Sequence, residues 1–264
     1  MFPGAYDIMN PLSTDQHKTL SILIPAYNES RTIEELLDRI LKVDLGHIDK
    51  EIIVIDDAST DNTAKIIESY INSTGRKDLR FISSPTNSGK GAAIRNGIEA
   101  ATGDYIIIQD ADLEYDPEDY NELLSPILAG EADVVYGSRP KGKKPHGSLF
   151  FWHLAGNRIL TWLSNIFTGM NLTDMETCYK LFRSDILQKL WLVEKRFGFE
   201  PEVTAKISRI PGIRIVEVEI SYSGRSYMEG KKITWKDGIR ALYCIIKYNL
   251  FFRKTYRDDR HPKK

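Results

Sequence analysis

The chain has 264 residues, 42% of them hydrophobic and 28% charged, and a formal net charge of −1. A chain of this size and composition is typical of a globular protein with one large domain or two small ones. The balanced charge gives no general attraction to nucleic acid, so we expect no nucleic-acid partner.

The first 18 residues precede any regular pattern. They are polar and contain Pro3 and Pro11, so we expect a loose arm. They lack the basic and apolar regions of a signal peptide, and no stretch of about 18 uninterrupted apolar residues predicts a membrane span. The two cysteines, Cys178 and Cys244, have neither a disulfide framework nor metal-site spacing, which fits a reducing compartment. We therefore expect a cytoplasmic protein.

Residues 19–140 alternate between short apolar runs, which predict buried strands, and amphipathic segments, which predict helices. The expected strands are 20–25, 51–55, 79–83, 105–109 and 133–137, and the expected helices begin near residues 32, 63, 89 and 116. Thr32 and Glu35 have the spacing of a capping box, and Asp116 with Pro117 is typical of a helix start. The alternation predicts a mainly parallel sheet with helices on both faces.

After residue 140 the alternation stops. Residues 141–235 contain a basic, glycine-containing loop at 141–147, expected strands at 179–183 and 214–221, and an expected helix at 200–209. Residues 236–264 form a basic amphipathic helix and tail. We expect a soft boundary near residue 140 inside one compact unit, with 19–140 and 141–235 as its two halves.

Two segments have the pattern of amphipathic helices. Residues 149–168 are rich in Leu, Phe, Trp and Ile and carry polar side chains at helical spacing, namely His153, Asn157, Thr161, Ser164 and Thr168. Residues 236–253 carry Lys236, Arg240 and Lys247 on one face, opposite aliphatic side chains. Such helices either pack on the sheet or lie in a membrane interface. For the second segment, the basic face and the tail favour a membrane surface.

Carboxylates follow the expected strand at 105–109. Asp110 and Asp112 are one residue apart, and a turn after the strand can direct both towards one cleft. Ligands of parallel sheets bind beyond these strand ends, and Mg²⁺ or Mn²⁺ takes carboxylate oxygens together with substrate phosphates. Glu114 could add a ligand. The alternative is a solvated turn or a cap for the following helix.

Asp56 and Asp57 end the second expected strand in the same way. They could accept hydrogen bonds from a nucleobase or ribose, or they could cap the next helix, although Asp61 could also do that. The stretch Gly89-Lys90-Gly91 lacks the third glycine of a dinucleotide fingerprint. We expect its glycines to let the helix begin close to the sheet.

Five pieces in order resemble the inverting glycosyltransferases of family 2, which have the Rossmann-like GT-A fold. They are Pro25–Glu29, Val54–Asp61, Asn87–Gly91, Asp110–Glu114 and Gly137–Arg139. Three further pieces are similar to the branch that makes polyprenyl-phosphate sugars, which includes the dolichyl-phosphate mannose synthases. These pieces are Asp174–Arg183, Phe199–Glu202 and Ser221–Lys232, so the resemblance covers residues 20–248.

The resemblance implies roles for individual residues. The nucleoside would be held by Pro25, Tyr27, Glu29, Ile55 and Asp57. Asp110, Ala111, Asp112 and Glu114 would form the metal and diphosphate site. Arg139, Arg225 and Lys231 would bind phosphates of donor or acceptor. Lys180 stands where many members have Arg, so the acceptor phosphate would be held differently or the acceptor would differ.

The implied function is metal-dependent, inverting transfer of mannose or glucose from GDP-mannose or UDP-glucose to a polyprenyl phosphate. A phosphate acceptor is already anionic, so catalysis would rest on positioning and charge stabilisation. Asp174 would act as a general base for a hydroxyl acceptor or, as we favour, pair with a cation near the phosphates. The alternatives are a saccharide or other hydroxyl acceptor, and a sugar-nucleotide-binding protein without activity. The intact Asp110–Asp112 pattern argues against the last.

Overall fold

The structure is a computed structural model that describes residues 17–139, 148–224, 235–252 and 254–257, without the side chains of 148–154. Several predicted features lie outside the described residues. They are most of the N-terminal arm, the basic loop 141–147, Arg225, Lys231 and the end of the tail.

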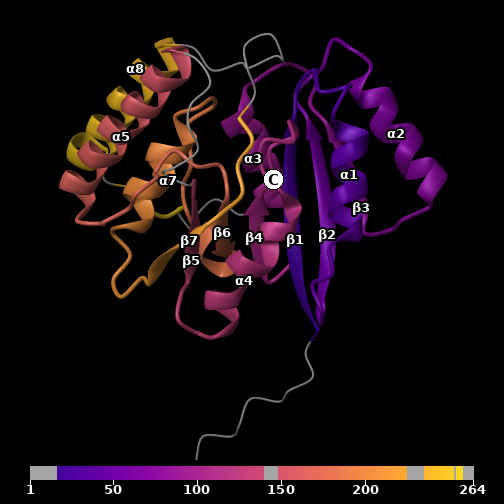
Figure 1. Cartoon of the computed structure of the whole chain (residues 1–264), viewed down its shortest axis with the longest axis horizontal. Helices are drawn as coiled ribbons and strands as arrows, with labels where there is room; N and C mark the ends of the chain where they lie inside the picture. The colour runs from indigo at the N-terminus through magenta and orange to yellow at the C-terminus, as the bar shows by residue number, and fades with distance from the viewer. Residues whose placement is uncertain (1–16, 140–147, 225–234, 253, 258–264) are drawn as a thin grey trace, which may run out of the picture.

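Seven strands form one sheet in the order β3-β2-β1-β4-β6-β5-β7. The strands are β1 (Lys18–Ala26), β2 (Ile48–Asp56), β3 (Leu79–Ser83), β4 (Tyr105–Ile108), β5 (Val134–Ser138), β6 (Lys180–Arg183) and β7 (Ile215–Glu219). All neighbours are parallel except β6, which runs antiparallel to both β4 and β5. The predicted mainly parallel α/β fold is confirmed (Figure 1).

The helices follow the strands closely along the chain (Figure 1). They are α1 (Ile33–Lys42), α2 (Thr63–Thr74), α3 (Lys90–Ala100), η1 (Pro117–Asp119), α4 (Tyr120–Leu128), α5 (Ser148–Thr168), α6 (Ser184–Leu187), α7 (Phe199–Ile207), α8 (Trp235–Ile246) and η3 (Lys247–Phe251). The two expected halves share the sheet, because β6 of the second half lies between β4 and β5 of the first.

Helix α3 approaches the sheet through Gly97, where an added Cβ would lie 2.9 Å from Ile55 Cδ1. Gly89 and Gly91 were also expected to let the helix begin close to the sheet, and this expectation was wrong. A Cβ at Gly89 would lie 2.5 Å from the carbonyl oxygen of Lys195, and one at Gly91 would lie 2.6 Å from that of Glu194. Because Gly89 and Gly91 lack side chains, the backbone of the segment 194–196 can pack directly on the first turn of α3. The two glycines face this segment and not the sheet.

The capping box predicted at the start of α1 does not form. The helix begins at Ile33 as expected, but Thr32 makes no capping hydrogen bond. Its hydroxyl instead donates to the carbonyl oxygen of Ala111 at 2.7 Å, and Glu35 pairs with Arg39 one turn later. Thr32 thus ties the loop after β1 to the loop after β4. The predicted cap at Asp116 is confirmed, since its carboxylate accepts the Glu118 N–H at 3.2 Å.

Helices α5 and α8 pack side by side at one end of the molecule, with α8 continuing into η3 (Figure 1). On α5, the polar Thr161 and Ser164 are buried, while Ile159, Trp162 and Ile166 are 63%, 64% and 56% exposed. Thr161 accepts the Met175 N–H at 3.1 Å, which explains why the polar face turns inward. The described outer side of this helix is therefore mostly apolar, with Arg158 as an exposed cation.

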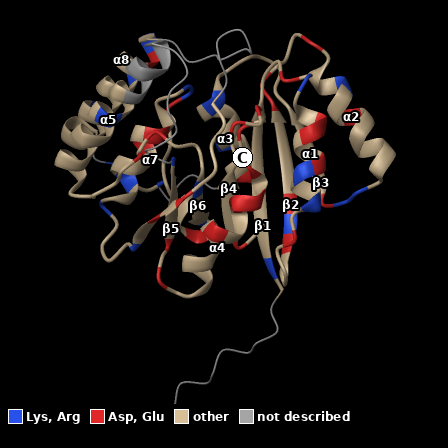
Figure 2. Cartoon of the chain, in the orientation of Figure 1, with Lys and Arg blue, Asp and Glu red and all other residues tan. Residues whose placement is uncertain are grey.

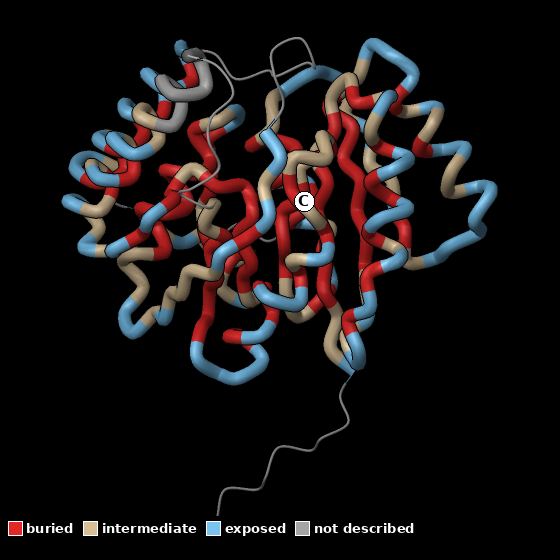
Figure 3. Tube along the Cα trace, viewed as in Figure 1, coloured by how far each residue is buried: buried red, intermediate tan, exposed pale blue. Residues whose placement is uncertain are grey.

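On α8, Lys236, Arg240 and Lys247 were predicted to form one basic face that favours a membrane surface. Arg240 and Lys247 pair with the buried carboxylate of Glu194, at 2.7 and 3.1 Å, although 49% of the Arg240 side chain stays exposed. Lys236 is exposed, and Ile239, Tyr243 and Phe251 are 57%, 52% and 80% exposed. A buried carboxylate requires counter-charges, so Glu194 engages two of the three cations of this face. Figure 2 shows little charge along α5, and Figure 3 shows exposed outer segments on both helices.

Within the described ranges, none of the helices has the length and hydropathy needed to cross a bilayer.

The side chain of Asp133, just before β5, contacts both neighbouring strands: Arg183 at the end of β6 and Arg214 just before β7. Its carboxylate accepts hydrogen bonds from Arg214 at 2.8 and 3.0 Å and from Arg183 at 3.1 Å. These bonds lower the pKa of Asp133 to about 2. Because the folded-state pKa lies below the unfolded value, the interaction stabilises the fold at neutral pH and is lost as the pH falls.

We predict that Asp133→Asn lowers the melting temperature at pH 7 and that the gap to the wild type closes between about pH 4 and pH 2. Thermal unfolding followed by circular dichroism across this range measures the gap. Asp185→Asn is the control, since Asp185 also pairs with Arg183 but is 52% exposed. A gap that does not change with pH would contradict the role given to the carboxylate.

Candidate active site

The carboxyl ends of β1, β2 and β4 meet at one edge of the sheet. Ala26 is in register with Asp56, and Leu23 is in register with Ile108. The Asp57 N–H donates to the Ala26 carbonyl at 2.9 Å, which extends the pairing beyond the strands. The residues expected to form a site after each strand are therefore neighbours, as the strand pattern predicted.

Three non-glycine residues with positive φ lie in these loops. They are Asn28 after β1, Ala58 after β2 and Leu113 after β4, with φ of 53°, 57° and 62°. Left-handed backbone is uncommon for Ala and Leu, and such strain concentrates at functional sites. Since each of the three loops contains such a residue, the loops are held in a shape that the chain alone does not favour.

Side chains fix the loop after β1 to the loop after β2. Asn28 accepts the Thr60 N–H through its side chain at 2.8 Å and donates its own N–H to Ser59 Oγ at 2.9 Å. The Glu29 N–H donates to Thr63 Oγ1 at 2.8 Å. Pro25 and Tyr27 are half-buried beside this framework, and Glu29 is buried. These residues are placed where the predicted nucleoside site would lie.

Two predicted nucleoside residues have structural contacts of their own. The Ile55 side chain is fully buried and packs beneath Gly97, so the role expected for Ile55 would fall to its main chain and stays a prediction. Asp57 is 3% exposed, and its two carboxylate oxygens accept the N–H groups of Ser88 and Gly89 at 2.8 and 2.6 Å. Asp57 thereby holds the turn that begins α3, while Asp61 binds the Thr63 N–H at the start of α2, at 2.9 Å.

An ion pair connects the start of α3 to the predicted metal site. Lys90 Nζ lies 2.7 Å from Asp110 Oδ1, 3.2 Å from Cys178 Sγ and 3.7 Å from Glu200 Oε1. Burial alone would lower the pKa of Lys90, but the neighbouring charges of Asp110, Cys178 and Glu200 raise it well above its usual value. The ammonium group is therefore a fixed positive charge beside the Asp110 carboxylate.

The three carboxylates expected to bind a metal differ in their surroundings. Asp110 and Asp112 are partly exposed, and Asp112 Oδ1 accepts the Glu114 N–H at 3.1 Å. Glu114 Oε2 accepts the Tyr222 hydroxyl at 2.8 Å. Within the described parts of the chain, no three His, Cys, Asp or Glu side chains gather as a metal site. One or two carboxylates with substrate phosphates suffice for Mg²⁺, so Asp110 and Asp112 fit a hard cation as donors.

Arg139 and Asp174 form a two-point ion pair at the end of β5. Arg139 Nε and Nη2 donate to the two oxygens of Asp174 at 2.6 and 2.7 Å. The guanidinium carbon also lies 5.1 Å from the centre of the Tyr222 ring. Burial would lower the pKa of Arg139, but Tyr115 and Asp174 raise it well above its usual value. The pairing favoured for Asp174 from the sequence is present in the structure.

Lys180 does not have the position expected of a phosphate ligand. Its side chain is fully buried, its ammonium group donates to the Thr177 carbonyl, and the ring centre of Tyr136 lies 4.9 Å away. Burial lowers the pKa of Lys180. The acceptor-binding role expected for Lys180 stays a prediction, and in this structure its ammonium group is engaged by a main-chain carbonyl. Arg225 and Lys231 stay predictions.

Sequence reasoning missed Lys90, Glu176 and Glu200 at this edge. All three stood inside pieces of the family resemblance, so their positions were usable signals, but none was given a role. Burial, and then the charge of Glu200, raise the pKa of Glu176 to about 8. Only the folded chain brings these groups together.

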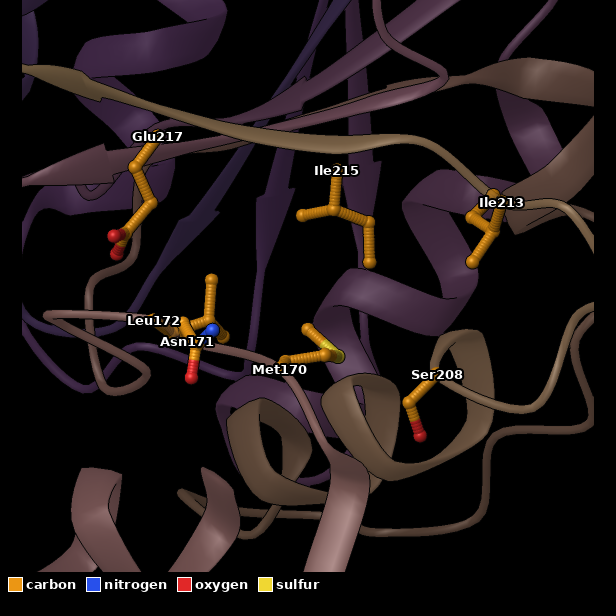
Figure 4. Close-up of a pocket in the computed structure, with 7 residues that line it drawn as sticks. All are labelled: Met170, Asn171, Leu172, Ser208, Ile213, Ile215 and Glu217. Carbon is orange, nitrogen blue, oxygen red and sulfur yellow. The ribbon is translucent and has the colours of Figure 1, made fainter. Parts of the chain in front are cut away.

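A cavity of about 400 Å³ lies apart from the predicted site residues, between the end of α5, the end of α7 and β7 (Figure 4). Met170, Leu172 and Ile215 give it an apolar lining, and Glu217 is at its rim. The Glu217 carboxylate accepts the Thr173 and Asp174 N–H groups at 2.8 and 3.2 Å. None of the predicted site residues lines this cavity.

Solved structures share the fold. The crystal structure of glucosyl-3-phosphoglycerate synthase from Mycobacterium tuberculosis in complex with Mn²⁺, UDP and phosphoglyceric acid has a TM-score of 0.67 and 20% identity. The match covers 92% of this chain and 80% of that one. At this identity the likeness shows the GT-A fold alone.

Curated relatives are similar over most of this chain. Dodecaprenyl-phosphate galacturonate synthase of Rhizobium johnstonii is 29% identical over 80% of the chain and 61% of its own length. Dolichyl-phosphate beta-glucosyltransferase of Dictyostelium discoideum is 28% identical over 84% of the chain and 71% of its own length. Undecaprenyl-phosphate 4-deoxy-4-formamido-L-arabinose transferase of Proteus mirabilis is 27% identical over 80% of the chain. This chain spans about three fifths of the first and third of these relatives.

The family model described as Glycosyl transferase family 2 matches residues 21–191. These residues include the edge of β1, β2, β4 and β5 and the Asp174–Lys180 segment. The chain therefore belongs to glycosyl transferase family 2 and has the GT-A fold.

Proposed function

We propose that this enzyme transfers a hexose, mannose or glucose, from a nucleotide-diphosphate sugar to a polyprenyl phosphate in a metal-dependent, inverting reaction. The observation that carries the proposal is the ion pair between Lys90 and Asp110 beyond the carboxyl end of β4, two residues before Asp112. Ligands of open parallel sheets bind at this edge. The names of the relatives support the acceptor, since all three contain a polyprenyl or dolichyl phosphate.

A divalent cation fits the acidic residues after β4. Asp110 and Asp112 would hold Mg²⁺ or Mn²⁺ together with the donor diphosphate, and the cation would stabilise the charge that the leaving diphosphate gains. The Lys90 ammonium group, fixed against Asp110, adds positive charge at the same place. Glu114 is a weaker candidate ligand because its carboxylate accepts the Tyr222 hydroxyl.

The acceptor phosphate would need orientation more than activation. A phosphate oxygen is already anionic near neutral pH, so the reaction requires no strong general base. Asp174 suits a supporting role, since both its oxygens accept hydrogen bonds from Arg139. Arg139 would in turn present its remaining N–H groups near the phosphates. The second candidate is a hydroxyl acceptor, for which Asp174 would have to leave Arg139 and accept a proton.

The apolar sides of α5 and α8 suit contact with a membrane, where a polyprenyl chain would reside. Ile159, Trp162 and Ile166 of α5 and Ile239 and Tyr243 of α8 are exposed on two helices that pack together. Aliphatic side chains with Trp and Tyr among them are typical of interfacial helices. The pairing of Arg240 and Lys247 with Glu194 offsets part of the basic charge of this surface, which favours shallow apolar insertion.

We predict that Asp112→Asn leaves the fold intact and reduces metal-dependent transfer by about a hundredfold, because electrostatic stabilisation of the leaving group is lost. The assay measures sugar transfer from GDP-mannose and UDP-glucose to a short polyprenyl phosphate with Mn²⁺. Asp116→Asn, which affects only the η1 cap, is the control. Undiminished turnover of Asp112→Asn would contradict the assignment of Asp112 as a metal ligand. If the wild type did not transfer sugar to polyprenyl phosphate, the proposed acceptor would be wrong.

We predict that Asp174→Asn destabilises the protein by about 3 kcal/mol, because Arg139 then lacks its counter-charge in a mostly buried position. Urea denaturation measures the change. Asp49→Asn is the control, since Asp49 is exposed. If Asp174→Asn instead kept full stability and lost transfer, Asp174 would be a catalytic base and a hydroxyl acceptor would be favoured.

We predict that the protein floats with phospholipid vesicles and stays bound when salt is raised from 0.15 to 1 M, where the Debye length falls from about 8 to about 3 Å. Trp162→Ser should weaken binding, because it removes an exposed aromatic side chain from the apolar side of α5. Leu128→Ser on α4 is the matched control, since Leu128 is 51% exposed on a different helix. Binding that disappears at high salt would contradict apolar insertion.

A further inference from the structure

The main chain of the segment 194–196 holds the start of α3, where Lys90 lies. The carbonyl oxygen of its middle residue accepts the Ala92 N–H at 3.1 Å, and that of Glu194 accepts a hydrogen bond from the Arg95 guanidinium at 2.6 Å. The glycines on either side of Lys90 leave no room for a Cβ against the same two carbonyl groups. The place of Lys90 therefore depends on the place of this segment.

The side chain of Glu194 connects the segment to the outer helices. Its buried carboxylate accepts hydrogen bonds from Arg240 at 2.7 Å, from Lys247 at 3.1 Å and from the Tyr248 hydroxyl at 2.6 Å. A Cβ at Gly198 would lie 2.8 Å from Glu194 Oε2, so the carboxylate is also enclosed from the start of α7. Burial would raise the pKa of Glu194, but the hydrogen bonds lower it to about 2, so the group is an anion at neutral pH.

The two ends of Glu194 thus act on different helices. The main-chain carbonyl group binds α3, and the carboxylate binds α8 and η3. Because the carboxylate is held at three points, a displacement of α8 or η3 would move the segment 194–196 and, with it, the first turn of α3. Energetic coupling between distant parts of a protein travels through such continuous networks of hydrogen bonds and ion pairs.

Lys90 is the charged group at the end of this network. Its ammonium group lies 2.7 Å from Asp110 Oδ1 and 6.0 Å from the ring centre of Phe197, which follows the segment 194–196 directly. A Lys side chain has a flexible stem, so its charge stays at one place only when its backbone and surroundings are fixed. A cation that is fixed in advance binds an anionic ligand more tightly, because less conformational freedom is lost on binding.

We propose that Glu194 is a positioning residue of the donor site, which sets Lys90 against Asp110 from the side of α8 and η3 and thereby raises the affinity for a nucleoside diphosphate. The inference rests on the proposed function in one respect, that a nucleoside diphosphate binds beside Lys90 and Asp110. The Glu194 carboxylate is enclosed by α7, α8 and η3, so its effect on the ligand must pass through α3. A purely structural Glu194 would instead support stability without a specific effect on nucleotide affinity.

A double-mutant cycle separates the two roles. Titration calorimetry with Mn²⁺, without any acceptor, measures the affinity of the full chain for UDP and GDP, and the cycle uses the tighter of the two. Lys90→Met removes the charge and should weaken binding by about tenfold, the effect of one lost charge-assisted hydrogen bond. Glu194→Gln should weaken binding by about threefold to tenfold in the wild-type background. In the Lys90→Met background it should weaken binding by less than about twofold, because both substitutions act on the same group.

Arg240→Met tests the same connection with the Glu194 carboxylate intact. The Arg240 side chain is 49% exposed, so we expect this variant to fold, and its effect on affinity should likewise disappear in the Lys90→Met background. Glu99→Gln is the matched control, since Glu99 lies on the same helix as Lys90 but pairs at the surface with Arg257 at 2.9 Å. It should change the affinity by less than about twofold. Thermal unfolding of each variant verifies that the titrated protein is folded.

The outcomes distinguish this inference from the proposed function. Equal losses of affinity in the wild-type and Lys90→Met backgrounds would overturn the positioning role. Folded Glu194→Gln and Arg240→Met variants that bind the nucleotide as tightly as the wild type would overturn it as well. A wild type that binds neither UDP nor GDP, or a Lys90→Met variant with unchanged affinity, would contradict the proposed donor site itself.

Discussion

The ion pair between Lys90 and Asp110 depends on the placement of the first turn of α3. Asp57 holds the N–H groups of Ser88 and Gly89, and this fixes the turn to the end of β2. On its other side, the absence of side chains at Gly89 and Gly91 admits the backbone of the segment 194–196. A small shift of the turn would therefore move a cation away from a carboxylate that the proposed diphosphate site requires.

The segment 194–196 is in turn held by the outer helices. The Glu194 carboxylate accepts hydrogen bonds from Arg240, Lys247 and Tyr248, and these contacts lower its pKa to about 2. Its backbone carbonyl accepts the Arg95 guanidinium at 2.6 Å. Glu194 thus joins α8 and η3, through its carboxylate, to α3, through its main-chain carbonyl.

The sequence predicted the features that follow from local pattern and strand order. Apolar runs located β1, β2, β4 and β5, and the rule that ligands bind beyond parallel strands directed attention to Asp57, Asp110 and Arg139. It could not predict which way a polar side chain turns when two partners compete. Thr32 had a capping position but donates to Ala111, and Lys180 had a phosphate-binding place in the resemblance but is buried. Both outcomes depend on contacts between residues distant in sequence, which periodicity does not record.

Unpaired oxygens and strained loops at one edge indicate a balance between stability and binding. Ala58 and Leu113 adopt a left-handed backbone, and Thr177 and Glu200 carry buried oxygens without partners among the described residues. Each feature destabilises the folded chain, so the large core of the sheet must offset it. Leu113 lies in the same loop as Asp110 and Asp112, so part of this strain is stored where the proposed donor diphosphate would bind.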